Sequence, residues 1–398
     1  MNVVKAAVEH LNPGQTPVLT MDQPLYAIAK QIQWNWPDTH GEEKYVIVFG
    51  GLHIEMAALK ALGNWLSNSG WTDAIVQAEI ATTGRADSFI SASHLKRTRR
   101  MHEVTAVALY IMQHMAYDKA MDGEDEPIDF NTWCDVQSKE HPQFCYCATT
   151  MKLELTVLQL VRSLREGNFS LYVDTVSKLI PWFFALDHVH YSRWLPVHVR
   201  DMRELPAKHP SVYAQFVDEN CVARKTSRKF SAIALDQAHE QLNASIKGEG
   251  GAVGLTENPS ALRRWTIAGP EVSRIIEEFE ISCQPVQHVM ETRHREQMAS
   301  TQKAFVNDVK SLVSAIDGLG NPFEEDSGEL LVLDSREIMH EEVSETVSHI
   351  EDIGKSQYQE YVKERLDDRS KLVSDNITRN KLALFSRPPV TEVSKAKS

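Results

Sequence analysis

A row of polar side chains in the segment 231–251 is the first candidate for chemistry. The segment reads SAIALDQAHEQLNASIKGEGG, and four polar residues follow one another at intervals of four, three and four positions: Asp236, Glu240, Asn243 and Lys247. On an α-helix this spacing places the four side chains along one face, opposite an apolar face. A charged helical face is most often solvated surface. The rest of the sequence therefore has to indicate whether this row belongs to a site.

Further candidate ligands for a metal ion follow predicted strands. Asp22 follows the β-branched stretch TPVLTM, and His53 and Glu55 follow the apolar stretch YVIVFGG. Mg and Mn ions prefer oxygen ligands, and two-metal phosphoryl transfer needs carboxylates that converge from separate elements. We therefore predict a Mg or Mn site with the ligands Asp22, His53, Glu55 and Glu240, and with Asp22, Glu240 and Asp236 as catalytic residues. Acidic residues are also common after strands that carry no site.

Two other groups of metal-binding residue types have ordinary structural alternatives. The stretch CDVQSKEHPQFCYC contains three cysteines and a histidine but no C-x2-C pair, and the alternative is free thiols at the start of a helix. The five cysteines of the chain form an odd, sparse set, which predicts reduced thiols rather than a disulfide framework. In LDHVHYSRW, Asp187, His188 and His190 are candidate ligands, and the alternative is a turn that caps the next helix.

The charge of the chain argues against simple nucleic-acid binding. The formal net charge is −13, whereas contacts to phosphate need a local positive surface. Basic residues nevertheless cluster in HLKRTRRMH, in ARKTSRK and at an arginine pair. We predict these nucleic-acid contacts: Lys96, Arg97, Arg99, Arg100, Lys247, Arg263 and Arg264. The alternative is that the clusters are solvated ends of helices and loops.

No segment of the sequence predicts export or insertion into a membrane. No apolar run reaches the roughly 18 residues of a membrane helix. The segment MNVVKAAVEHLNPGQTP has neither the apolar region nor the cleavage site of a signal peptide. We therefore expect no membrane partner and an intracellular location, the nucleus included.

Two strand–helix units open the chain, and helices dominate the rest. TPVLTMD with QPLYAIAKQIQWNW predicts a strand and a helix, and EKYVIVFGG with LHIEMAALKALGNWL predicts a second such unit. Residues 148–220 are nearly all helical in pattern, and CVARKTSRKFSAIALD returns to strand-like residues before the helix that carries Asp236. Neither Gly-x-Gly-x-x-Gly nor a Walker loop occurs, which argues against nucleotide binding by those two routes.

These patterns divide the chain into four expected regions. We expect the first part of an α/β core in residues 1–92, a helical insertion in 93–220, the closing part of the core with the acidic helix in 221–286, and a charged helical tail, partly flexible, in 287–398.

Several stretches resemble an uncharacterised, transposon-derived animal protein family. They include PVLTMDQPLYAIAKQIQWNWP, YVIVFGGLHIEMAALKALG and FSAIALDQAHEQLNASIKGEGGAVGLTENP, and the resemblance extends over most of residues 17–280. The order of elements is distantly similar to transposases with a ribonuclease H-like core. The resemblance implies a helix-dominated α/β fold, in which a ribonuclease H-like mixed sheet core is interrupted by an all-helical insertion and followed by a helical C-terminal tail.

The resemblance also implies which residues form the site. Asp22 matches an early acid of such a core, and Glu240 matches the closing glutamate, with Asp236 one turn before it. Where related transposon proteins have Gly-Asp-Phe-His, this chain has GGLH, so Gly51 takes the acidic position and His53 the histidine position. The implied function is a degenerate transposase core that, if active, uses Mg or Mn to cleave or transfer DNA phosphodiesters, with DNA as the partner.

A second class of function stays open beside the enzyme. A non-enzymatic helical binding or assembly protein would use the acidic tail and the helical insertion to hold its partners and would need no cofactor. Assembly into a homo-oligomer is compatible with both classes. Metal binding separates them, because only the enzyme requires it.

Overall fold

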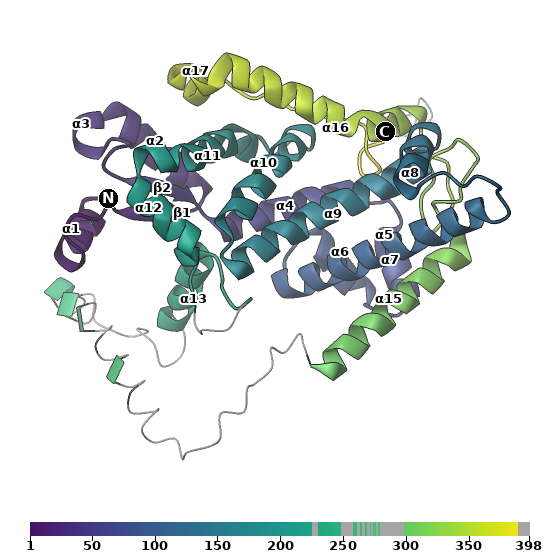
Figure 1. Cartoon of the computed structure of the whole chain (residues 1–398), viewed down its shortest axis with the longest axis horizontal. Helices are drawn as coiled ribbons and strands as arrows, with labels where there is room; N and C mark the ends of the chain where they lie inside the picture. Colours follow the sequence, from purple (N-terminus) through teal and green to yellow (C-terminus); the bar gives the residue numbers. More distant parts are fainter. Residues whose placement is uncertain are drawn as a thin grey trace. The chain divides into compact units, whose positions relative to one another are not determined.

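The chain forms two compact units. The computed structural model describes residues 1–224, 230–247, 258–260 and 298–388, together with isolated positions between 263 and 278. One unit comprises Met1–Gln237 with Val306–Ser398, and the other comprises Ala238–Phe305. The first unit holds both described strands and most of the described helices (Figure 1).

The sheet of the first unit consists of two parallel strands. These are β1 (Val18–Met21) and β2 (Val46–Phe49), paired in register along their whole length. Parallel neighbours cannot be joined by a tight turn, so the chain needs a crossover between them. Two helices provide it, α2 (Gln23–Asn35) and the short α3 (Pro37–His40).

Asp22 marks the boundary between β1 and α2. Its carboxylate Oδ1 accepts a hydrogen bond from the backbone N–H of Leu25 at 3.1 Å, which satisfies one unpaired donor at the start of the helix. Pro24 lies in the first turn, where the N–H that proline lacks would have no helical partner. The sequence therefore ends the strand and starts the helix at the same residue.

Four long helices pack together as the core of the first unit. Helix α10 packs against both α9 and α11, and α9 packs against α4. Trp65 of α4 stacks on Tyr146 of α9 with 4.9 Å between ring centroids, and its Nε1–H donates to the hydroxyl of Thr150 at 2.8 Å. The four helices are α4 (Gly51–Leu66), α9 (Pro142–Glu166), α10 (Phe169–Ala185) and α11 (Val189–Lys208).

Shorter helices and one long helix surround this core. Helices α7 and α8 both pack on α9, while α5 and α6 connect α4 to α7. The remaining helices before residue 221 are α1 (Asn2–Leu11), α5 (Trp71–Gln77), α6 (Thr83–Ile90), α7 (Leu95–Met121), α8 (Phe130–Glu140), α12 (Pro210–Gln215) and the π-helical turn η1 (Phe216–Asn220).

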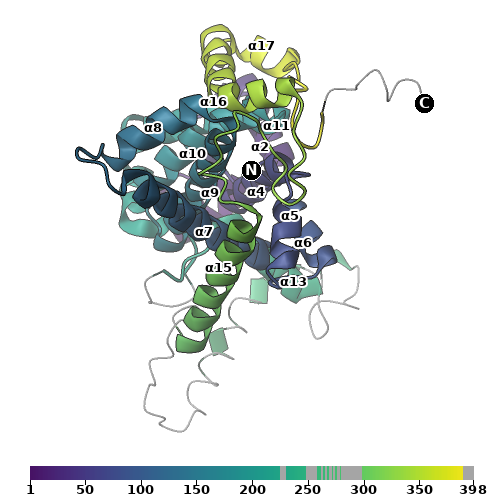
Figure 2. The same cartoon turned by 90° about the vertical axis from the view of Figure 1, so that its right-hand side faces the viewer.

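The C-terminal helices pack on the helices of the core. Helix α16 packs along α10 and touches α9 (Figure 2). Lys152 of α9 and Glu351 of α16 form an ion pair at 2.6 Å, and the guanidinium of Arg193 donates to the carbonyl oxygen of Val373 at 2.9 Å. These helices are α15 (Ala299–Leu319), α16 (Glu341–Tyr361), the π-helical turn η3 (Val362–Leu366) and α17 (Arg369–Ser374).

Helix α13 (Leu235–Lys247) begins in the first unit and continues in the second. Its first turn carries Asp236, which belongs to the first unit. Within the second unit, Arg274 forms ion pairs with Glu271 at 2.6 Å and with Glu278 at 2.5 Å. These pairs at helical spacing are exposed.

The predicted ribonuclease H-like mixed sheet core is wrong. Among the described residues the only sheet is the parallel pair of β1 and β2, and the remaining core is helical. In the strand-like stretch before α13, residues Ala223 and Ile233 form an isolated antiparallel bridge and no strand. The pattern misled because a strand, an acidic helix cap and a helix also follow one another in βαβ units of many other folds. Such a unit does not specify how many further strands join the sheet.

Candidate functional site

The carboxyl ends of β1 and β2 bring three predicted site residues into one region. Asp22 follows β1, His53 lies in the first turn of α4 after β2, and Asp236 lies in the first turn of α13. The Asp236 carboxylate is buried and accepts three hydrogen bonds, from the backbone N–H of Leu52 at 3.0 Å, from the backbone N–H of His53 at 3.2 Å and from the imidazole Nδ1 of His53 at 2.9 Å. The imidazole is the donor in the last contact, because an ionised carboxylate only accepts.

Gly50 makes this arrangement possible. A Cβ atom on Gly50 would overlap with the carboxylate of Asp236. The bare backbone lets the carboxylate approach the start of α4 and cap it from a residue far along the chain. The glycine after β2 thus allows the first turn of α13 to lie close to the start of α4.

Tyr191 of α11 lies in the same region. Its hydroxyl donates to the carbonyl oxygen of His53 at 3.2 Å. Burial, together with the negative charges of Asp22 and Asp236, raises the pKa of Tyr191 to about 12. Within the described residues, no three His, Cys, Asp or Glu side chains lie close enough together to hold a metal ion. The carboxylates of this region cap helices: Asp22 caps α2, and Asp236 caps α4.

Glu55 has a different partner from the one expected. Its buried carboxylate forms a two-point ion pair with the guanidinium of Arg99, through Nε and Nη2. This pair joins α4 to α7. Glu55, a predicted metal ligand, and Arg99, a predicted nucleic-acid contact, therefore bind each other.

The other predicted nucleic-acid contacts fall into three groups. Arg100 pairs with Asp308 of α15 at 2.9 Å, whereas Lys96 and Arg97 are exposed at the start of α7. Arg263 and Arg264 are exposed in the second unit. The side chain of Lys247 and the stretch 225–229 lie outside the described residues.

Glu240, the predicted closing glutamate, belongs to the second unit. Its side chain is exposed on α13. Asp236, four residues earlier, belongs to the first unit and is buried. The stripe of polar residues that the sequence places on one face therefore contains residues in two different environments.

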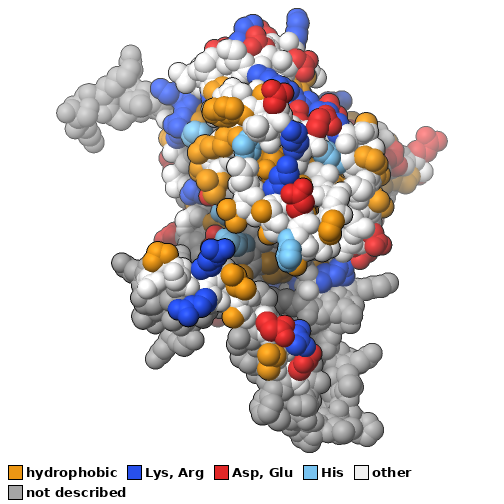
Figure 3. Space-filling view, turned by 90° about the vertical axis from the view of Figure 1, so that its left-hand side faces the viewer, with side chains coloured by type: hydrophobic (Ala, Val, Ile, Leu, Met, Phe, Trp, Pro, Cys, Tyr) orange, Lys and Arg blue, Asp and Glu red, His pale blue; other side chains and the backbone are white. Residues whose placement is uncertain are grey.

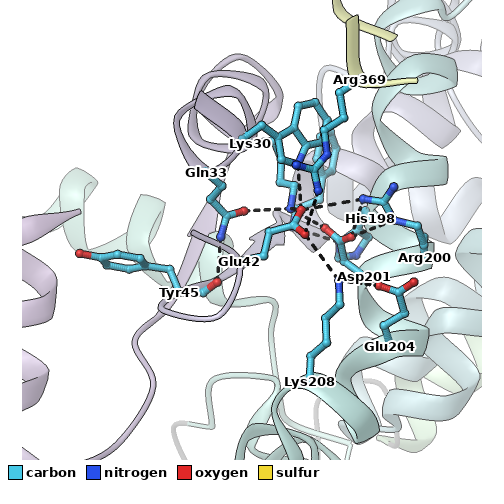
Figure 4. A network of polar contacts seen from close by, with 12 residues as sticks. Lys30, Gln33, Glu42, Tyr45, His198, Arg200, Asp201, Glu204, Lys208 and Arg369 are labelled. Atoms are coloured by element: carbon cyan, nitrogen blue, oxygen red, sulfur yellow. Dashed lines mark hydrogen bonds and ion pairs between the residues drawn. The ribbon is translucent and has the colours of Figure 1, made fainter. Parts of the chain in front are cut away.

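The sequence did not reveal a network of charges around the buried amine of Lys30 (Figure 4). The Lys30 Nζ lies 2.8 Å from oxygens of Gln33, Glu42 and Asp201, so its three protons have three acceptors. The side chain is 3% exposed. A signal was present, because Lys30 shares the inward face of α2 with Tyr26 and Ala29. A lysine on an apolar helical face predicts buried acidic partners, because a buried charge is costly unless it is paired.

Glu42 is the centre of this network. Its carboxylate accepts from the indole Nε1 of Trp34 at 2.8 Å and lies 3.5 Å from the cations of Lys208 and Arg369. Burial alone would raise the pKa of Glu42, but the adjacent Lys30 ammonium, Trp34 and Lys208 lower it to about 2. The network ties α2, α11 and α17 together at the amino end of β2. Since the Lys30 donors are all engaged, we interpret it as structural.

An open groove of about 790 Å³ lies on the first unit where α9 ends and α10 begins, bounded by α11, α12 and η1. Its volume falls in the range of sites that hold small molecules or short segments of partners. The apolar lining consists of Phe169, Val173, Met202, Pro206, Tyr213, Val217 and Phe230. The charged lining consists of Glu166, Asp174, Arg203, Glu219 and Arg224.

Gly167 shapes one wall of the groove. It ends α9 in the left-handed conformation, with φ of +76°, and a Cβ there would come within about 3 Å of Glu219, Arg224 and Val222. Arg224 donates to the carbonyl oxygen of Glu166 at 2.7 Å and pairs with Glu219 at 2.5 Å. The arginine and its partners are thus held in position before any ligand arrives.

Comparisons with known proteins assign the chain to a family and give no activity. A family model described as Domain of unknown function (DUF8702) matches residues 1–126 and 125–381. No curated protein matches the chain, and no solved structure matches it. Within the described residues, no helix is both long enough and apolar enough to cross a membrane. The two matched segments cover nearly the whole sequence, and the chain belongs to the family of the domain of unknown function DUF8702.

Proposed function

We propose that this protein is a non-enzymatic binding protein that holds an apolar segment of a partner in the groove between α10, α11 and η1. The observation that carries the proposal is the groove itself, which combines an apolar floor with a charged rim. Binding sites typically have this composition, because apolar contacts supply affinity and a few polar groups fix orientation.

The floor and the rim of the groove differ in exposure. Phe169, Val173 and Met202 are buried at its base, whereas Val217 is 57% exposed at its edge. An exposed apolar residue beside a buried apolar floor offers surface that a partner can remove from water. The arginines and carboxylates of the rim favour a partner whose apolar part is flanked by charged or polar groups.

The experiment uses anilinonaphthalene sulfonate, a fluorescent probe with apolar rings and one anionic group. Val217→Glu places a carboxylate at the edge of the groove, and we expect it to weaken probe binding by about tenfold. Leu155→Glu is the matched control, because Leu155 is 46% exposed on α9 and does not line the groove. Equal probe affinity in Val217→Glu and the unmodified protein would overturn the proposal, provided that circular dichroism shows both folded.

The competing function is metal-dependent cleavage of DNA phosphodiesters. One observation favours it: Asp22, His53 and Asp236 come from three separate elements to the carboxyl ends of two parallel strands, where α/β proteins commonly bind ligands. Against it, both carboxylates already accept hydrogen bonds that cap helices. The binding proposal is therefore the better supported of the two.

A calorimetric titration with Mn²⁺ separates the two functions. Asp22→Asn is the informative variant, because asparagine also caps helices but carries no charge. Heat of binding in the unmodified protein that disappears in Asp22→Asn would favour the enzyme. Absence of saturable heat in both proteins is the result that we expect for a binding protein.

A further inference from the structure

The outer edge of β1 carries backbone groups to which no described residue bonds. Alternate residues of a strand face a parallel neighbour. The carbonyl oxygen of Pro17 accepts from the N–H of Val46 at 2.9 Å, so Pro17 faces β2 and the next residue faces away. Val18 and Thr20 therefore direct their N–H and C=O groups outward. In the part of the chain that the structure describes, no hydrogen bond reaches these four groups.

The outer edge of β2, in contrast, forms hydrogen bonds with side chains. The carbonyl oxygen of Tyr45 accepts from the side-chain amide of Gln33 at 2.9 Å, and the N–H of Phe49 donates to Nδ1 of His198 at 3.5 Å. Side chains of α2 and α11 thus bond to both ends of that edge, and helix α11 packs against β2. A strand edge without such cover is a template for another strand.

An apolar flank of α2 lies on the side of the uncovered edge. Helix α11 packs against the flank of α2 that carries Lys30 and Trp34, and it also contacts β2. At the helical spacing, Leu25 and Ile28 lie on the opposite flank, which is the β1 side of the crossover. They are 55% and 53% exposed. Figure 3 shows hydrophobic side chains gathered on the face of the molecule where α2 lies in Figure 1.

We propose that the outer edge of β1 binds an extended strand of a partner polypeptide whose side chains toward α2 are apolar. Alternating donors and acceptors along β1 match the backbone of an extended chain, whereas a helix satisfies its own backbone groups and leaves those of β1 unpaired. Leu25 and Ile28 would cover the side chains of the added strand. This site is separate from the groove, so either proposal can fail without the other.

The first experiment measures whether a strand binds through its backbone. The probe is a fluorescent peptide with the sequence EKYVIVFG, which copies the segment that pairs with the other edge of β1. Two further versions carry N-methyl groups on alternate residues, one along each edge of the peptide. Fluorescence anisotropy should show that one methylated version loses binding and the other retains it, because only one edge of an added strand donates to β1. Equal binding by both versions overturns backbone pairing.

The second experiment locates the site on the protein. Ile28→Lys removes an exposed apolar contact beside β1, and we expect it to weaken binding of the unmethylated peptide by about tenfold. Ile111→Lys is the matched control, because Ile111 is an exposed isoleucine on α7. Thr20→Pro is a second test, because proline removes one outward N–H that bonds to none of the described residues. Unchanged affinity in both Ile28→Lys and Thr20→Pro overturns the proposal.

The oligomeric state distinguishes a partner strand from a second copy of the chain. Sedimentation velocity should show the same state for the unmodified protein and for Ile28→Lys. A dimer that Ile28→Lys converts to a monomer would identify a second copy as the occupant and would overturn the proposal of a partner polypeptide.

Discussion

The stability of this protein should depend on pH through the buried imidazole of His198. His198 lies on α11 and is fully buried beside β2. Its Nδ1 accepts from the N–H of Phe49 at 3.5 Å, and its Nε2 lies 2.9 Å from the hydroxyl of Tyr172. Because a backbone N–H points at Nδ1, that nitrogen must keep its lone pair. The neutral imidazole fits this environment and the imidazolium does not.

Burial, opposed by the charge of Asp201 and supported by that of Lys30, lowers the pKa of His198 from 6.5 to about 4. The unfolded chain therefore binds this proton first, and stability is lost as the pH falls from 6.5 toward 4. Between pH 7 and pH 5 the loss from this one group is about 2 kcal/mol in the free energy of unfolding. His188 adds to the loss in the same direction, since burial also lowers its pKa to about 4.

A second buried histidine, His102, has an acidic partner that opposes its contribution to this acid-induced loss. His102 and Glu154 are both buried and lie 3.0 Å apart. Burial lowers the pKa of His102 to about 3 and raises that of Glu154. A proton on the folded pair therefore favours the glutamate, whereas a proton on the unfolded pair favours the histidine. As the pH falls, proton uptake by the folded glutamate opposes proton uptake by the unfolded histidine, so the two contributions to the pH dependence of stability have opposite signs.

The assay is urea unfolding followed by circular dichroism at pH 7 and at pH 5. His198→Asn keeps an acceptor near Phe49 but cannot be protonated, so the difference between the two pH values should shrink by about 2 kcal/mol. Its lost contact to Tyr172 lowers stability equally at both pH values and cancels in that difference. His190→Asn is the matched control, because His190 is an exposed histidine on the same helix. A full acid-induced loss in His198→Asn would refute the assignment to this imidazole.

Three further predictions concern polar contacts that hold elements together. Asp236→Ala should lower the free energy of unfolding by about 2 kcal/mol in a urea titration, because it removes the cap of α4; an unchanged midpoint would contradict the capping role. Gly50→Ala should destabilise the protein through overlap with the Asp236 carboxylate, and a double-mutant cycle should show less loss once Asp236 is alanine. Lys30→Met should cost about 3–5 kcal/mol, since it leaves Glu42 and Asp201 without their buried cation; thermal unfolding at the unmodified midpoint would argue against that role.

Local patterns in the sequence determine the first elements of the fold. The stretch VLTM forms β1, VIVF forms β2, and the helices after them begin where Asp22 and the glycine pair predict. These are features that a few adjacent residues specify, through strand propensity, capping and helical periodicity. The same local patterns made a larger mixed sheet appear consistent with the sequence, although they carry no information about the number of strands.

Tertiary structure alone decided which side chains meet. Glu55 pairs with Arg99, Asp236 caps a helix that begins 185 residues earlier, and Lys30 finds an acceptor on α11. Spacing along one helix predicts which residues share a face, but it does not predict which distant element covers that face. The partner of a buried charge depends on how helices pack, because packing sets both the distance between the groups and their exposure to water. Asp22 therefore follows β1 as the sequence predicts, while only the packed chain revealed that the carboxylates of Asp22 and Asp236 cap helices.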